Sequence, residues 1–92
     1  MNDRYTVHSN RESGLGRFDI QLCPYNKQLP GFIIELKVSK DASDDLGKLS
    51  GTALSQIGQK KYDEEMRSLG INKVIMIGIA FRGKEIAVAQ KS

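Results

Sequence analysis

With 92 residues, the chain has room for one small domain, and we interpret residues 1–92 as a single domain. Its 39% hydrophobic and 27% charged residues are typical of a soluble globular protein, and no apolar run is long enough to span a membrane. The single Cys23 excludes an intramolecular disulfide and a cysteine-rich zinc site. The net charge of +3 is compatible with a polyanionic partner, and the polar residues after Met1 favour a cytoplasmic location.

Three strands are predicted in the first 38 residues, from alternating or β-branched apolar patterns. They are residues 4–8, 17–22 and 31–38. A polar, glycine-bearing loop precedes the second strand, and a loop bounded by prolines precedes the third. The third strand carries Glu35 and Lys37 on one face, since side chains alternate along a strand. Charges inside an apolar strand are costly unless they are paired, so this strand is the first indication of a site.

The second and third strands are joined by a short loop, which predicts an antiparallel hairpin. Its register is fixed by the apolar faces, because a slip of one residue would expose a whole set of apolar side chains. These faces consist of Phe18, Ile20 and Leu22 on one strand and Phe32, Ile34 and Leu36 on the other. The same register brings Asp19 to the face of Glu35 and Lys37, and an equal-length pairing places Asp19 opposite Glu35. The pattern alone allows a functional acidic site or a structural cross-strand ion pair.

The second half of the chain predicts one helix and two strands. The helix extends from about Leu46 to Ser68, with Asp44 and Asp45 as candidates for its N-cap and first turn and Gly70 after its end. Strands follow over residues 73–81 and 84–90. The fold class is therefore α/β, a small mixed sheet in the order β-β-β-α-β-β, in which the helix connects parallel neighbours. The strand over 73–81 is apolar on both faces, whereas one helix covers only one face.

Several stretches together resemble the PD-(D/E)XK nuclease superfamily, and in particular the branch usually found C-terminal to an AAA-ATPase-like domain in bacterial proteins. The central motif is Asp19 followed on the next strand by Glu35-Leu36-Lys37. The matching stretches are residues 9–19, 33–38, 53–57 with 60–62, and 77–81 with 83–84. The resemblance covers nearly the whole chain and implies a restriction-endonuclease-like core.

The sequence also departs from that pattern. Family members usually carry a helix before the first strand, and this sequence begins at that strand, so we expect the usual N-terminal helix to be lacking. The family's glutamine and tyrosine on the helix are commonly four residues apart. Here Gln56 and Tyr62 are six apart, so they would not share a face of one continuous helix.

The resemblance implies metal-dependent hydrolysis of a phosphodiester. Asp19, Glu35 and the backbone carbonyl of Leu36 would hold Mg²⁺ or Mn²⁺, hard cations that prefer oxygen ligands. Lys37 would orient the attacking water and offset charge in the transition state. Glu12 is interpreted either as a further acid near the metal or as a solvated loop residue.

Residues around this motif are candidates for substrate contacts, each with a structural alternative. Gln56 would contact substrate or water as a catalytic residue, or lie on the surface. Arg17, Lys60 and Lys61 would meet backbone phosphates, or form solvated faces. Tyr62 would contact the substrate, or pack in the core.

Two functions remain open at this point. The first is a divalent-metal-dependent nuclease acting on nucleic acid, with DNA as the expected substrate. The second is a catalytically inactive nucleic-acid-binding or assembly module with a relic nuclease site. In either case we expect a second copy of the chain, or a missing helix or ATPase-like domain of a longer protein, to cover the open sheet face.

Overall fold

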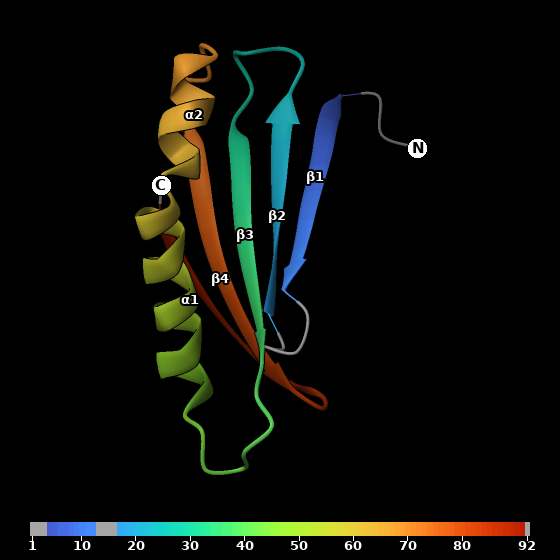
Figure 1. Ribbon diagram of the computed structural model, residues 1–92, viewed down its shortest axis with the longest axis vertical. Helices are drawn as coiled ribbons and strands as arrows, with labels where there is room; N and C mark the ends of the chain where they lie inside the picture. Colours follow the sequence, from blue (N-terminus) through green and yellow to red (C-terminus); the bar gives the residue numbers. More distant parts are fainter. Residues whose placement is uncertain (1–3, 13–16, 92) are drawn as a thin grey trace.

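The computed structural model describes residues 4–12 and 17–91. Five strands form one sheet in the spatial order β1-β2-β3-β4-β5 (Figure 1). The elements are β1 (Tyr5–Glu12), β2 (Arg17–Pro24), β3 (Gly31–Val38), α1 (Leu46–Lys60), α2 (Tyr62–Ser68), β4 (Val74–Arg82) and β5 (Glu85–Lys91). Neighbouring strands are antiparallel except for β3 and β4, which are parallel and are connected through the helices. The predicted small mixed α/β sheet is confirmed.

The first strand is longer than the sequence predicts. Strand β1 pairs with β2 along its whole length, from Tyr5 opposite Pro24 to Glu12 opposite Arg17. Continuing the ladder satisfies backbone hydrogen-bonding groups that a polar loop would leave to water, so pairing overrides the weak local pattern. Glu12 therefore lies in a strand, whereas the sequence placed it in a loop.

The single expected helix is divided into two by Lys61. This residue has φ 59° and ψ 25°, in the left-handed region, and it ends α1 and begins α2. Asp45 caps α1, and its side chain accepts a hydrogen bond from the backbone N–H of Lys48. Gly70 has φ 96° and follows α2, as expected for a residue that terminates a helix. Neither helix is long and apolar enough to cross a bilayer, and this holds for the described residues only.

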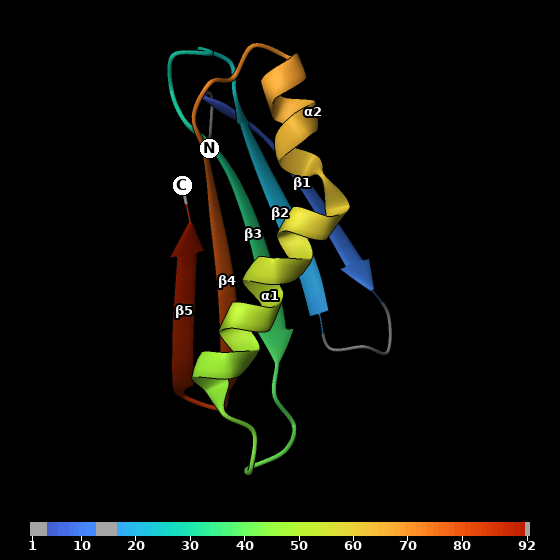
Figure 2. The same ribbon diagram turned by 90° about the vertical axis from the view of Figure 1, so that its left-hand side faces the viewer.

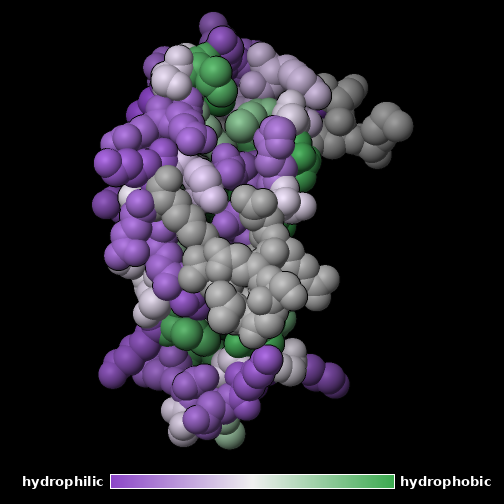
Figure 3. Space-filling view, in the orientation of Figure 1, coloured by the Kyte–Doolittle hydropathy of each residue, from purple (hydrophilic) through white to green (hydrophobic). Residues whose placement is uncertain are grey.

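Both helices lie on one face of the sheet (Figure 2). The hydrophobic core is located between them and β3 and β4, and it consists of Ile33, Ile57, Met66, Ile71, Val74 and Met76. Gly78 on β4 permits close packing of α1. A Cβ at this position would clash with the carbonyl oxygen of Ser50 and lie 2.6 Å from the backbone nitrogen of Leu54. The outer surface of the helices, at left in Figure 3, is hydrophilic.

The opposite face of the sheet is covered by no element among residues 4–12 and 17–91. Its side chains are large and aliphatic or aromatic, and those on β3 and β4 are only half-buried. They include Ile20, Leu22, Phe32, Ile34, Leu36, Ile75, Ile77, Ile79, Phe81, Ile86 and Val88. We call this set the open face. The helices thus cover the face that carries the charged residues, and the more hydrophobic face faces outward.

Candidate functional site

Two carboxylates lie opposite one another under the helices. Asp19 on β2 is the direct register partner of Glu35 on β3, as the hairpin prediction requires. Asp19 is 3% exposed and Glu35 is fully buried. Cβ atoms of directly opposed residues are about 4.5–5.5 Å apart. Two carboxylates this close in a region of low dielectric repel each other when both are ionised, and a cation removes that repulsion.

The position of α1 over this pair follows from the sheet register. Glu35 is flanked on one side by Asp19 and on the other by Gly78 of β4. Because Gly78 has no side chain, the backbone of α1 at Ser50 and Leu54 approaches the sheet closely at this level. Helix α1 therefore covers the sheet beside Glu35 and contributes to the complete burial of this carboxylate.

Gln56 lies on the flank of α1 that faces the acidic pair. The other flank, with Gly51, Leu54 and Gly58, lines a depression together with residues of β4 and β5. Gln56 is about 160° around the helix from that flank, at about 100° per residue. Helix α1 also contacts β3, so this second flank faces the strand that carries Glu35. The Oε1 atom of Gln56 is buried and accepts no hydrogen bond from the described residues.

Lys37 lies two residues after Glu35 on β3 and is half-buried. Alternation along the strand places its side chain on the same face as Glu35. Its register partner on β4 is Ala80, which is fully buried. The structure thus brings Asp19, Glu35 and Lys37 to one face of two neighbouring strands.

This set of groups is compatible with a hard divalent cation. Among the described residues there is no cluster of three His, Cys, Asp or Glu side chains that could hold a metal. Mg²⁺, however, is usually bound by only one or two carboxylates and keeps several waters. The buried, opposed oxygens of Asp19 and Glu35 meet that requirement. Carboxylate oxygens suit Mg²⁺ or Mn²⁺, whereas zinc sites are usually built from several cysteine or histidine ligands.

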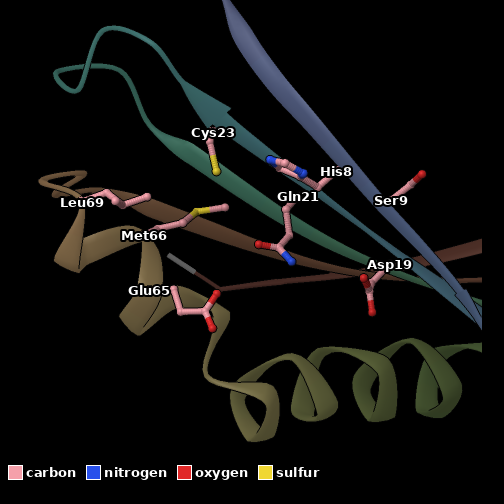
Figure 4. Close-up of a pocket in the computed structure, with 8 residues that line it drawn as sticks. All are labelled: His8, Ser9, Asp19, Gln21, Cys23, Glu65, Met66 and Leu69. Atoms are coloured by element: carbon pink, nitrogen blue, oxygen red, sulfur yellow. The ribbon is translucent and has the colours of Figure 1, made fainter.

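A groove opens beside Asp19 and extends along β2 toward α2. Its volume is about 420 Å³. It is lined by His8, Ser9, Asp19, Gln21, Cys23, Glu65, Met66 and Leu69 (Figure 4). Burial raises the pKa of the Cys23 thiol, which therefore stays protonated at neutral pH and is a poor nucleophile.

The sequence patterns do not predict this groove between β2 and α2. The alternation of Asp19, Gln21 and Cys23 on β2 was a usable signal for one wall. Glu65 and Leu69 had no such signal, because their approach to β2 depends on the break in the helix at Lys61.

Among the described side chains, the remaining predicted site residues do not lie beside the acidic pair. Lys61 is exposed at the junction of the helices. Tyr62 is half-buried and packs against the hydrophobic core. The side chains of Glu12, Arg17 and Lys60 lie outside what the structure describes.

Comparison with known proteins agrees with the geometry. The sequence profile of the PD-(D/E)XK nuclease superfamily matches residues 1–91, which is nearly the entire chain. Searches of curated proteins and of solved structures returned no match. The profile spans the opposed Asp19 and Glu35 and the Lys37 that follows them, and on this evidence the chain belongs to the PD-(D/E)XK nuclease superfamily.

Proposed function

We propose that this chain is a divalent-metal-dependent nuclease that hydrolyses phosphodiester bonds of DNA. The observation that carries the proposal is the buried, directly opposed pair Asp19 and Glu35, with Lys37 on the same face. Two carboxylates on neighbouring strands supply the oxygen ligands that a hard divalent cation prefers. Membership of the superfamily supports the same reaction.

In this proposal Asp19, Glu35 and the backbone carbonyl of Leu36 hold Mg²⁺ or Mn²⁺, with Glu12 as a further acid nearby. When bound, the cation polarises a phosphoryl oxygen and lowers the pKa of a water molecule. Lys37 donates a hydrogen bond that orients the attacking water and offsets the negative charge that develops on the phosphoryl oxygens. Gln56 positions the water or the substrate from the helix above. The water oxygen gives up a proton to solvent as it bonds to phosphorus, the bond to the leaving oxygen breaks, and that oxygen takes up a proton from solvent.

Basic and aromatic residues outside the acidic pair would position the nucleic acid. We propose that Arg17, Lys60 and Lys61 contact backbone phosphates and that Tyr62 contacts the substrate at the junction of the helices. Phosphate contacts of this kind hold the strand without reading its sequence. They would also offset the repulsion between a polyanionic backbone and the two site carboxylates.

The test is cleavage of plasmid and single-stranded DNA in Mg²⁺ or Mn²⁺, compared among the wild-type protein and three variants. Asp19→Ala and Lys37→Ala remove site residues, and Glu64→Ala is the control, because Glu64 is an exposed acid on α2 away from the pair. The proposal requires cleavage that is lost in both site variants and with chelator and retained in the control. Cleavage that survives Asp19→Ala would show a contaminating nuclease and refute the assignment.

A second candidate is a catalytically inactive nucleic-acid-binding or assembly module, which the open face favours. A contiguous hydrophobic sheet face such as the open face is typical of a surface that contacts another chain or domain. We propose that a second copy covers it, the alternative being a helix or ATPase-like domain belonging to a longer protein. A folded protein that binds nucleic acid but neither cleaves it nor binds a divalent cation would establish this second function.

A further inference from the structure

The groove beside Asp19 continues away from the acidic pair in a straight line. Asp19, Gln21 and Cys23 project from the same face of β2, so at about 3.3 Å per residue the wall extends about 13 Å from the first to the last Cα. The opposite wall is α2, which contributes Glu65, and the groove is about 420 Å³ in volume (Figure 4). This volume is within the range of small-molecule sites and is large enough for a single nucleotide unit.

The chemistry of the groove changes along its length. At one end Asp19 belongs to the acidic pair that we assign to the metal. In the middle, the amide of Gln21 and the carboxylate of Glu65 project into the groove from opposite walls (Figure 4). At the far end the lining is apolar or sulfur-containing, with Met66, Leu69 and Cys23. His8 lines the groove from β1.

This lining disfavours two kinds of occupant. Among the described residues that line the groove, Asp19 and Glu65 are carboxylates and none is a lysine or arginine, so a phosphate would meet two carboxylates there. A second metal is also disfavoured, because Asp19 is assigned to the first cation and Glu65 is the other carboxylate among the described residues that line the groove. The described lining therefore suits an occupant that is polar at its edge, apolar on its faces and not anionic.

We propose that the groove binds one unpaired nucleobase adjoining the scissile phosphate, an inference that rests on the nuclease function proposed above. The phosphate lies at Asp19 with the metal, and the base extends along β2. One face contacts Leu69, and the imidazole of His8 offers a stacking surface. Gln21 and Glu65 bind the base edge, where an amide both donates and accepts and a carboxylate accepts from an exocyclic amino group.

The consequence is a preference for single-stranded or locally unpaired nucleic acid. A base in a duplex is stacked on both faces, and its Watson–Crick edge is already paired. It cannot reach a groove between a sheet and a helix unless it leaves the stack, which costs energy. A single-stranded base does not have to be extruded, so single-stranded substrate should bind and react better.

The first test measures binding without activity. The probe is deoxycytidine monophosphate, titrated in Mg²⁺ into isotopically labelled protein and followed by NMR. The control ligand is deoxyribose 5-phosphate, which carries the same sugar and phosphate but no base. We expect the nucleotide to shift the Gln21 side-chain amide and the Leu69 methyl groups, and the control to leave both unchanged. Equal shifts from both ligands, or no shift at these groups from either, would overturn the inference.

The second test uses paired variants at exposed positions, which leave the fold intact. Glu65→Ala and Leu69→Ala remove groove contacts. The matched controls are Glu64→Ala on the same helix and Val7→Ala, because Val7 on β1 is 54% exposed and Leu69 is 56% exposed. We expect the double groove variant to weaken binding of a fluorescent single-stranded oligonucleotide about 5- to 150-fold, the range for losing contacts to one base. The affinity of the same variant for a blunt-ended DNA duplex should change less than twofold.

The two proposals fail in distinguishable ways. Base-dependent NMR shifts in a protein that never cleaves would uphold the groove inference and refute the nuclease function. Cleavage that is lost in Asp19→Ala, but equal on single-stranded and duplex DNA and insensitive to the groove variants, would uphold the nuclease and refute the groove.

Discussion

Asp19 and Glu35 lie directly opposite one another on β2 and β3, on the face of the sheet that α1 covers. Their side chains are almost completely shielded from water, in a position where an ordinary domain has aliphatic residues. The same face supplies Ile33 to the hydrophobic core two residues away from Glu35. The site is therefore built into the core, and changes at the site and in the packing around it are expected to influence each other.

Divalent cations should stabilise the protein through this pair. A ligand that binds only the folded state at ten times its Kd adds about 1.4 kcal/mol to the free energy of unfolding. For a domain of this size that raises the melting temperature by about 6–11 °C. We expect this shift with Mg²⁺ or Mn²⁺ in calorimetry, and its loss in Asp19→Asn and in Glu35→Gln. A full shift in either variant would show that the cation binds elsewhere.

Gln56→Leu should lower activity without lowering stability. Its Oε1 atom is buried without a hydrogen-bond donor among the described residues, so replacing the amide by a similar apolar group removes a desolvation cost. We expect cleavage to fall about tenfold if this amide positions water or substrate. Gln59→Leu, at an exposed position on the same helix, should leave the rate unchanged. A large drop in melting temperature for Gln56→Leu would instead indicate a structural role.

Gly78→Ala should disturb both the fold and the site. The added methyl group would meet the backbone of Ser50 and Leu54, which cannot move without displacing α1. We expect a loss of about 1–3 kcal/mol in the free energy of unfolding and reduced activity, because α1 also carries Gln56.

Gly51→Ala is the matched control for this packing argument. A Cβ at Gly51 meets nothing within 4 Å, and alanine is the better helix former by about 1 kcal/mol. Urea denaturation of both variants measures the free energy of unfolding, which should fall for Gly78→Ala and rise for Gly51→Ala. A fall in both variants, or no change in Gly78→Ala, would contradict the packing at Gly78.

Lys61→Gly should stabilise the protein and weaken its binding to nucleic acid. Lysine in the left-handed region carries a steric cost that glycine does not, which we expect to yield up to about 1 kcal/mol. Loss of one phosphate contact should reduce the slope of log affinity against log salt by about 1. Lys61→Ala separates the effects, because it removes the charge and keeps the strained backbone. Unchanged salt dependence in both variants would mean that Lys61 does not touch phosphate.

The open face should bring two chains together in solution. Val88 on β5 is 58% exposed and belongs to this face. We expect analytical ultracentrifugation to give a dimer for the wild-type protein and a monomer for Val88→Lys. Leu69→Lys introduces the same charge on the helical side and should remain dimeric. A well-folded wild-type monomer would count against the dimer and leave a helix or a further domain as the cover.

The sequence by itself determined the number and order of the strands, the hairpin register and the meeting of Asp19 with Glu35 and Lys37. These follow from alternation and from matching apolar faces, which are local properties that a one-residue slip would destroy. The motif also predicted the superfamily, which the profile match confirms.

Only the tertiary structure decided which face of the sheet the helices cover. Both faces of β4 are apolar, so periodicity could not distinguish them, and the close approach of α1 at Gly78 selected the face with the carboxylates. The break at Lys61 depends on a single left-handed residue that is not glycine, a conformation that local propensity does not predict. That break sets the position of α2, and with it the groove that Glu65 and Leu69 complete beside Asp19.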